Sequence, residues 1–290
     1  KGVHEHRRKT VLVFQDPVLL DATVHANIAS GLKIRGMRKK NIDTVVDLQL
    51  ERFRIAHLKK RNAKTLSGGE AQRTSLARAF ALEPDVLLLD EPFSSLDVKA
   101  RECLMDDLEK ALRDTGTGTV FTTHDRLEAF RLADRIAILS GGRIVQDGSP
   151  REIMLNPANE FVAAYAGVEI LLSGEVRSSD PDSFVLNVSG KDIEVAGNAK
   201  KGERMTVGLR PENVIISTER GGRISARNTF HGSITRIIPM GHYYRVSIDC
   251  GFNLVSHVTG HSIDSLSLDE GMDVEVFFKA TSVHIIRRDA

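Results

Sequence analysis

The first half of the chain alternates short apolar runs with segments whose apolar positions recur at helical spacing. The apolar runs are typical of buried strands and lie at Val11–Phe14, Val86–Leu89, Thr119–Thr122 and Ile136–Leu139. Helical spacing predicts helices at Thr74–Ala81, Val98–Leu112 and Arg126–Ala133. Such alternation predicts an α/β fold with a mostly parallel sheet covered by helices.

The pattern changes after the stretch "NPANEFVAAYAG", residues 156–167. Beyond it the chain has short β-type runs and glycine turns, and no long segment with helical spacing. We therefore expect two domains, an α/β domain at 1–165 and an all-β domain at 166–290.

The second region contains an internal repeat. "GERMTVGLRPENVII" from Gly202 and "GMDVEVFFKATSVHII" from Gly271 align without a gap over most of their length, at a separation of 69 residues. Each copy opens with a glycine strand, "SGEV" at 173–176 and "HGSI" at 231–234. The repeat predicts two small OB-like β-barrels in tandem. The alternative is a chance similarity of two strand–turn–strand units, because hairpins use few turn types.

Composition narrows the class of protein. The 290 residues carry 40 basic and 39 acidic side chains, a net charge of +1, so we expect no nucleic-acid surface. Cys103 and Cys250 lie far apart and without metal-ligand spacing, which argues against a disulfide framework or a zinc site. No run approaches the roughly 20 apolar residues of a spanning helix, so we expect that the chain does not cross a membrane by itself.

Two adjacent glycines precede a helical pattern in "TLSGGEAQRTSLARAF", residues 65–80. Glycine is a poor residue for a helix interior, but it leaves backbone amides uncovered where an anion approaches. The positive end of the helix dipole then faces that anion. The stretch therefore predicts a phosphate cradle.

Acidic residues follow an apolar strand in "DVLLLDEPFSSLD", residues 85–97. Side chains at the carboxyl end of a parallel strand point into the crevice where ligands bind. Asp90 could hold a magnesium ion there, and Glu91 could orient or deprotonate an attacking water. The plainer alternative is a pair that only solvates the edge of the sheet. Gln15 and His124 also directly follow apolar strands, so one crevice could receive all four side chains.

Taken in order, these segments resemble the ATPase subunit of an ABC transporter over roughly residues 10–165. The Q-loop would hold Gln15, the signature would be Leu66–Glu70, and Walker B would be Val86–Asp90 with Glu91. The D-loop would be Ser95–Asp97 and the switch histidine His124. The end of such subunits is also similar to "GGRIVQDGSPREI", residues 141–153. The resemblance implies a P-loop NTPase-type ABC ATPase domain.

The same resemblance implies roles for individual residues. Gln15 and Asp90 would serve Mg²⁺, Glu91 would be the catalytic carboxylate, and His124 would contact the γ-phosphate of ATP. The remaining members would help to bind nucleotide, with the signature acting on ATP held by a second subunit. They are Ser67, Gly68, Gly69 and the D-loop residue Asp97.

One expected motif is absent from the sequence. No G-x-x-x-x-G-K-[ST] occurs, and the one Gly-Lys pair, Gly190-Lys191, lies in the β-rich region. In the family this Walker A loop precedes the Q-loop, and the chain begins with Lys1 rather than methionine. We therefore expect an ATPase domain that is incomplete at its N-terminus and that binds ATP poorly as it stands. The alternative is a degenerate, inactive subunit.

The second region resembles molybdate-binding Mop barrels from Ile224 to Ile286, through "SARNTFHGSI" and "KATSV". A tetrahedral dianion is held by hydroxyls, amides and fixed cations. That set would be supplied by Ser225, Arg227, Thr259, Lys279 and Thr281. The alternative is that these are exposed polar groups on a barrel that only braces a dimer.

Together the resemblances imply the ATP-hydrolysing subunit of a molybdate or tungstate importer, with barrels that sense the oxyanion inside the cell. Its cofactors would be ATP and Mg²⁺. Its partners would be a second copy, transmembrane permease subunits contacted near residues 16–32 and, indirectly, an extracytoplasmic solute-binding protein, at the cytoplasmic face of the membrane. Two alternatives remain: an importer subunit for another solute such as sulfate or a sugar, and a soluble oxyanion-binding protein with a relic ATPase half.

Overall fold

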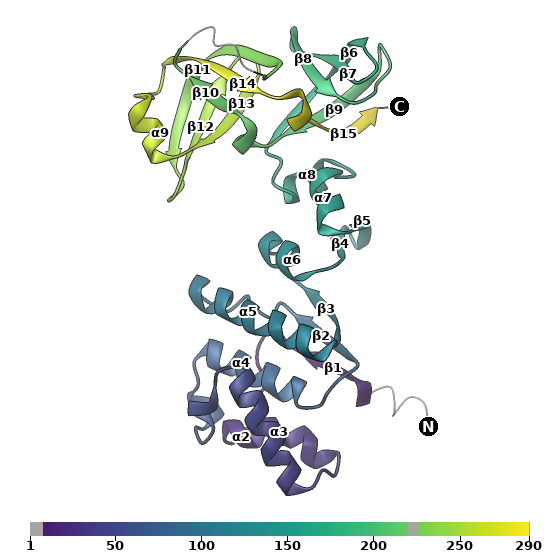
Figure 1. Cartoon of the computed structure of the whole chain (residues 1–290), viewed down its shortest axis with the longest axis vertical. Coiled ribbons are helices and arrows are strands. Elements are labelled where there is room, and N and C mark those ends of the chain that lie inside the picture. The colour runs from purple at the N-terminus through teal and green to yellow at the C-terminus, as the bar shows by residue number, and fades with distance from the viewer. Residues whose placement is uncertain (1–7, 220–224, 290) are drawn as a thin grey trace. The chain divides into compact units, whose positions relative to one another are not determined.

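The computed structural model describes residues 8–219 and 225–289, and Figure 1 labels their helices and strands. The chain divides into two compact units, Lys1–Leu132 and Ala133–Ala290, and each is described by itself. Two positions used above, Lys1 and Ile224, lie outside the described residues. The boundary between 165 and 166 stays a prediction.

A three-stranded parallel sheet forms the centre of the first unit. Its strands are β1 (Thr10–Val13), β2 (Val86–Asp90) and β3 (Gly118–Thr122), in the order β1-β2-β3. Val13 pairs with Leu89, and Leu89 pairs with Phe121. The strands predicted in these three regions are confirmed to within one residue at each end. Because all three strands are parallel, their carboxyl ends lie along one edge of the sheet.

Helices accompany this sheet, and their ends follow local sequence signals. They are α2 (Val24–Ile34), α3 (Lys39–Arg52), α4 (Gly68–Phe80), α5 (Val98–Thr115) and α6 (Arg126–Leu132), with single 3₁₀ turns η1 (Ala56–Leu58) and η2 (Ala63–Thr65). Helix α5 begins after Asp97, whose carboxylate accepts a hydrogen bond from the Ala100 amide, and ends at Gly116 with a φ of 63°. The predicted helices are confirmed, and α4 starts six residues earlier than predicted.

Within the described part of the chain, helices cover one face of this sheet. Val13, Leu87 and Leu89 are buried in one cluster with side chains of α4 and α5. The alternate positions point to the other face, where Leu12 is 47% exposed and Val120 is 62% exposed. Parallel sheets are normally buried on both faces, so this apolar face is unusual for an α/β unit.

The fourth predicted strand is confirmed as a strand, but it does not join the parallel sheet. Instead, β4 (Ile136–Ser140) pairs antiparallel with β5 (Arg143–Gly148). The reason lies in the turn between them, where Gly141 and Gly142 have φ values of 55° and 75°. Two successive left-handed residues form the turn of a tight hairpin, so the chain folds straight back. Short helices α7 (Pro150–Leu155) and α8 (Glu160–Tyr165) follow.

The remainder of the second unit consists of two five-stranded sheets. The first copy of the repeat provides β6 (Ile170–Ser179), β7 (Ser183–Val188), β8 (Lys191–Ala196), β9 (Arg204–Leu209), η3 (Pro211–Asn213) and β10 (Ile215–Ser217). The second copy provides β11 (Asn228–Pro239), β12 (Tyr244–Asp249), β13 (Asn253–Val258), α9 (Gly260–Ser265), β14 (Asp273–Phe278), η4 (Ala280–Ser282) and β15 (His284–Asp289). The order of elements therefore bears out the repeat.

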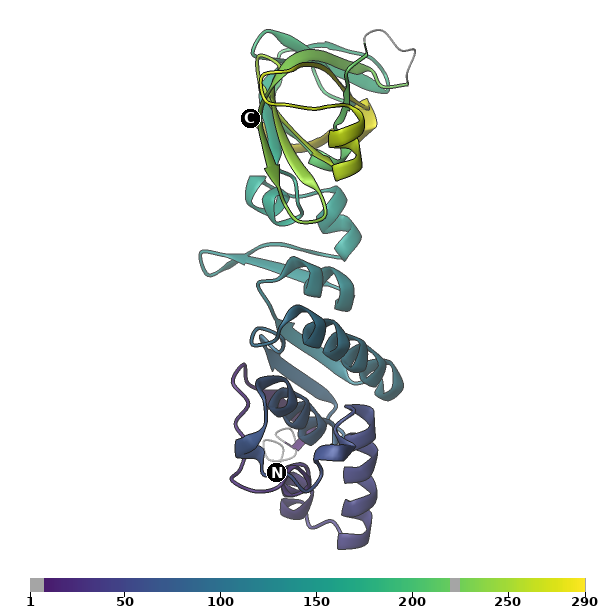
Figure 2. The same ribbon diagram turned by 90° about the vertical axis from the view of Figure 1, so that its left-hand side faces the viewer.

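Each copy gives its last strand to the other copy's sheet. The sheet orders are β10-β14-β11-β12-β13 and β15-β9-β6-β7-β8. Ile216 of β10 pairs with Val276, and Ile285 of β15 pairs with Val207. Side chains of both sheets share one buried cluster, and Figure 2 shows strands of both copies around a common interior. The two predicted barrels are thus interlocked through exchanged strands.

The glycine strand that opens each copy has a steric reason. A Cβ on Gly174 would lie 2.2 Å from the Asn187 carbonyl oxygen, and a Cβ on Gly232 would lie 2.5 Å from that of Asp249. Two residues later, the register of each strand shifts at a bulge, after Val176 and after Ile234. Glycine therefore permits the close crossing that curves both sheets.

Three further features bear on the sequence predictions. The turn between β7 and β8 is Ser189-Gly190, with φ values of 50° and 83°, and Lys191 is the first residue of β8, so the Gly190-Lys191 pair belongs to a hairpin. Cys103 and Cys250 are both free. Among the helices of the described residues, none combines the length and the apolar character required to span a bilayer.

Candidate functional site

The carboxyl edge of the parallel sheet gathers the acidic residues predicted from the sequence. Asp90 ends β2 and is exposed, and one of its oxygens accepts a hydrogen bond of 2.6 Å from the Thr122 hydroxyl at the end of β3. The Glu91 amide donates to the Thr122 carbonyl, at 3.1 Å. Thr122 therefore fixes both carboxylate-bearing residues, and sequence analysis did not select it.

Glu91 and His124 lie side by side. His124 Nδ1 is 3.1 Å from Glu91 Oε2, and the imidazole is 76% exposed. Glu91 has a φ of 40°, a left-handed conformation that costs a non-glycine residue on the order of 1 kcal/mol or more. Ser94 contributes to holding this turn, since its amide and its hydroxyl both donate to the Glu91 carbonyl. The two predicted catalytic side chains are brought together here.

Oxygen ligands suitable for Mg²⁺ lie at the same edge. The hydrogen bond from Thr122 occupies only one Asp90 oxygen, Oδ1, on an exposed carboxylate. Gln15 is exposed two residues after Val13, the partner of Leu89, so it follows β1 where Glu91 follows β2. Within the described part of the chain, no three His, Cys, Asp or Glu residues form a metal-holding group. This set fits Mg²⁺, which proteins commonly hold through one or two side chains plus substrate phosphates.

The predicted phosphate cradle is the first turn of α4. Ser67 and Glu70 form a capping box: the Ser67 hydroxyl accepts from the Glu70 amide, and Glu70 Oε2 accepts from the Ser67 amide at 2.8 Å. The bond from the Ser67 amide lowers the pKa of the Glu70 carboxyl. The amides of Gly68 and Gly69 belong to a turn that has no intrahelical acceptors. The capping box explains how a helix can begin on two glycines.

The signature turn lies against the predicted D-loop. A Cβ on Gly68 would be 3.9 Å from the Ser95 carbonyl oxygen, and one on Gly69 would be 3.3 Å from Leu96 Cδ2. Asp97, the last D-loop residue, is exposed and caps α5. The structure therefore brings the signature and the D-loop together.

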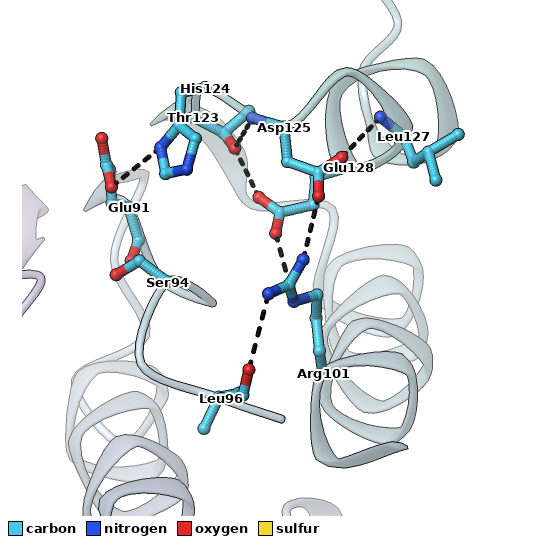
Figure 3. A network of polar contacts seen from close by, with 9 residues as sticks. All are labelled: Glu91, Ser94, Leu96, Arg101, Thr123, His124, Asp125, Leu127 and Glu128. Atoms are coloured by element: carbon cyan, nitrogen blue, oxygen red, sulfur yellow. Dashed lines mark hydrogen bonds and ion pairs between the residues drawn. The ribbon is translucent and has the colours of Figure 1, made fainter. Parts of the chain in front are cut away.

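A network that the sequence did not reveal joins the D-loop to the loop of His124, as Figure 3 shows. Arg101 Nη1 donates to Asp125 Oδ2 at 2.9 Å, and Arg101 Nη2 reaches the Leu96 carbonyl oxygen at 3.5 Å. Glu128 accepts from the Thr123 hydroxyl, and burial raises the pKa of this carboxyl although that hydrogen bond and Arg101 lower it. The sequence offered one indication of this network. Arg101 lies four residues after Asp97, and this spacing places both residues on one side of the first turn of α5.

In the second unit, only some of the predicted anion ligands come together. Asn228 pairs with Phe278, so Arg227 and Lys279, the next residues along, lie at the same end of the β11–β14 pair. Thr281 follows in η4, and Ser225 comes shortly before β11. All four residues are exposed.

Thr259, the fifth predicted anion ligand, does not lie near the other four. It follows β13, whose Val258 is aligned through Tyr244 with Pro239, the far end of β11 from Arg227. Its hydroxyl caps α9 by accepting from the Ser262 amide at 3.2 Å. Within one chain, the structure does not bring Thr259 to the predicted anion ligands.

The first unit thus has paired carboxylates and a histidine at the carboxyl edge of a parallel sheet, with a glycine-rich helix start on the adjoining loop. This combination fits a nucleotide-hydrolysing class of α/β protein, in which ligands bind at the carboxyl edge of the sheet. A sequence profile described as ABC transporter matches residues 1–94, and one described as TOBE domain matches residues 224–285.

The chain is also similar in sequence and structure to known proteins of that class. The chain is 34% identical to the molybdate/tungstate import ATP-binding protein WtpC of Pyrococcus abyssi, over 96% of this chain and 79% of that protein. It is 36% identical to the spermidine/putrescine import ATP-binding protein PotA of Thermotoga maritima, over 85% and 69%. The solved structure of cbiO1 from Clostridium perfringens, part of the ABC transporter complex cbiONQ, has a TM-score of 0.50 at 30% identity, over 52% of this chain and 61% of that one. The chain therefore belongs to the ABC-type ATPases, the ATP-binding subunits of ABC transporters.

Proposed function

We propose that the protein is the ATP-hydrolysing subunit of an importer for molybdate or tungstate. The curated relatives named for molybdate/tungstate import include the WtpC proteins of Pyrococcus abyssi and Thermococcus kodakarensis, the latter 40% identical over 73% of this chain and 62% of that protein. The observation that carries the ATPase half of the proposal is the contact between Glu91 and His124 at the edge of the sheet.

In this proposal, Asp90 and Gln15 hold Mg²⁺, which supplies charge neutralisation at the phosphates of bound ATP. Glu91 orients the attacking water and accepts its proton. His124 Nδ1 contacts Glu91, so Nε2 is the ring atom left to contact the γ-phosphate. Ser67, Gly68 and Gly69 bind the γ-phosphate of ATP held by a second copy, and Asp97 lies beside that nucleotide.

Assembly follows from the same roles. A signature turn that acts on the nucleotide of another subunit requires a second ATPase subunit, and in this proposal that subunit is an identical copy. We propose that the dimer contacts transmembrane permease subunits through residues 16–32, at the cytoplasmic face of the membrane. An extracytoplasmic solute-binding protein would deliver the oxyanion to that permease.

For the second unit we propose an oxyanion sensor at the Arg227 end of β11. Lys279 and Thr281 follow β14 there, so two cations and a hydroxyl are available to a tetrahedral dianion. The first copy differs at the equivalent place, since Glu169 precedes β6 and Glu212 follows Arg210 after β9. Two carboxylates repel a dianion, so the pseudosymmetric unit offers one anion site rather than two.

Relatives that are named for the import of other solutes have sequence identities to this chain similar to those of the WtpC proteins. Besides PotA, the maltose/maltodextrin import ATP-binding protein MalK of Vibrio parahaemolyticus is 30% identical over 99% of this chain and 77% of that protein. Identity alone therefore does not separate the solutes. The Arg227–Lys279 pair favours an anion over a polyamine as regulatory ligand, because like charges repel. An importer subunit for sulfate or a sugar remains the alternative.

Calorimetry on the 290-residue chain tests the substrate. We expect molybdate and tungstate to bind and sulfate to give no heat at the same concentration. Lys279→Ala should abolish the binding, and Lys201→Ala, which removes an exposed lysine elsewhere, should leave it intact. Equal binding of sulfate, or binding unchanged in Lys279→Ala, would remove the substrate assignment. Sequencing the gene upstream of Lys1 separates a transporter ATPase from a relic, because an in-frame G-x-x-x-x-G-K-[ST] supports the ATPase.

A further inference from the structure

Arg101 occupies a junction between two loops of the first unit. It lies in the first turn of α5, directly after the D-loop, and its guanidinium reaches back to the Leu96 carbonyl oxygen. On its other side it forms an ion pair with Asp125, the residue after His124. The side chain is 30% exposed, so the ion pair is partly shielded from water.

Several hydrogen bonds and ion pairs hold the loop that carries His124. Among those drawn in Figure 3, the contacts of Arg101 connect this loop to the D-loop. Within the loop, the Asp125 amide donates to the Thr123 hydroxyl at 3.0 Å, and Asp125 Oδ1 accepts from the Leu127 amide at 2.8 Å. Asp125 thus orders the loop through one oxygen and receives Arg101 on the other.

The charges around Arg101 favour this arrangement. Arg101 Nε is buried without a hydrogen-bond partner among the described residues, and it lies 3.8 Å from Glu128 Oε1. Two carboxylates therefore face one guanidinium. A planar fork with several donors can serve a carbonyl and two carboxylates at once, which the point charge of a lysine cannot do.

We propose that Arg101 is a positioning residue that holds the D-loop and the His124 loop as one rigid unit. The D-loop lies against Gly68 and Gly69 of the signature, and His124 lies against Glu91. A displacement of the signature turn, which faces the ATP of the second copy, would move the D-loop. Arg101 would then pass this movement to His124 and Glu91, which face the ATP bound by the same chain. The catalytic consequence rests on the proposed function, whereas the coupling of the two loops does not.

Hydrogen exchange on the 290-residue chain tests the coupling without nucleotide. In Arg101→Met we expect amides at 94–97 and at 122–128 to exchange about tenfold faster or more, because both loops lose the same anchor. The matched control is Arg131→Met, since Arg131 also joins α6 to α5, and its ion pairs among the described residues are with Asp106 and Glu109 of α5 rather than with either loop. Faster exchange in only one loop, or in neither, overturns the proposal.

ATP hydrolysis by the complete gene product, including any residues upstream of Lys1, tests the catalytic part. We expect Arg101→Met to lower kcat on the order of 100-fold and to leave KM for ATP within about threefold of the wild-type value. ATP would still bind, but the D-loop and His124 would no longer be held in the positions that hydrolysis requires. Arg101→Lys should give an intermediate kcat, since it keeps the charge and loses the fork. An unchanged kcat in folded Arg101→Met overturns the positioning role. A wild-type protein without ATPase activity would instead refute the proposed function, and the exchange result would still stand.

Discussion

His124 Nδ1 lies 3.1 Å from a carboxylate oxygen of Glu91, at the ends of neighbouring parallel strands. The carboxylate of Glu91 is 30% exposed, so water can reach it. A carboxylate with a histidine neighbour and access to water is suited to direct a nucleophile at a phosphate. This relationship supports the assignment of Glu91 as the catalytic carboxylate.

Glu91→Gln should remove ATP hydrolysis and retain ATP binding. The amide keeps the size of the side chain but cannot accept a proton, so we expect kcat to fall about 10²- to 10⁴-fold. The measurement is phosphate release by the complete gene product, with binding of a fluorescent ATP analogue as the control. Wild-type turnover in the variant would exclude Glu91 as the general base.

Gly68→Glu should abolish turnover without unfolding the protein. The nearest atom to a Cβ at Gly68 is the Ser95 carbonyl oxygen at 3.9 Å, so space for the side chain exists. The added carboxylate would occupy the helix start where a phosphate of the partner's ATP is expected, and it would repel that phosphate. Thermal melting of the variant should match that of Gly68→Ala, and ATPase activity should be lost in Gly68→Glu. Normal activity there would count against a signature that acts on the other subunit.

Gly232→Ala should destabilise the second unit. The new Cβ would lie 2.5 Å from both the Asp249 carbonyl oxygen and Cys250 Sγ, and backbone atoms cannot yield cheaply. Overpacking of this kind costs about 1–3 kcal/mol. Gly260→Ala is the matched control, since its Cβ would meet Tyr244 at an ordinary 3.5 Å. Denaturant unfolding followed by circular dichroism measures both variants, and equal stabilities would contradict the close crossing of β11 and β12.

Cys250 should resist alkylation near neutral pH. Burial raises its pKa from an ordinary 9.0 to about 11, so little thiolate is present at pH 8. In Cys103→Ser, the alkylation rate with iodoacetamide should rise nearly tenfold per pH unit towards pH 11. Since the folded pKa is the higher one, stability should also fall as the pH rises from about 9 to about 11. Rapid labelling of native Cys103→Ser at pH 7 would show that Cys250 is accessible.

Much of the first unit could be read from the sequence. The strands around Leu12, Leu88 and Val120 are short apolar runs, and the residues that follow them carry the chemistry, so the clustering of Asp90, Glu91 and His124 follows from parallel strand order. The strand at Ile136–Leu139 has the same apolar pattern but lies outside the parallel sheet. Its partner depended on the turn at Gly141-Gly142, which periodicity alone does not weigh.

Other features depend on partners distant in sequence. The repeat in the second unit predicted which strands exist, but it did not indicate which sheet β10 and β15 join, because each pairs with a strand of the other copy. The junction at Arg101 was similarly hidden, because Asp125 lies 24 residues away and only packing of α5 beside the His124 loop joins them. Thr259 was selected for its hydroxyl, which the structure uses for a helix cap.

The exchange of β10 and β15 has a consequence for the ancestry of the second unit. A polypeptide carrying only one copy would leave its own sheet without an edge strand and could complete it by borrowing that strand from an identical chain. Such a protein would be an intertwined dimer, and fusing its two genes end to end would yield the present single-chain arrangement.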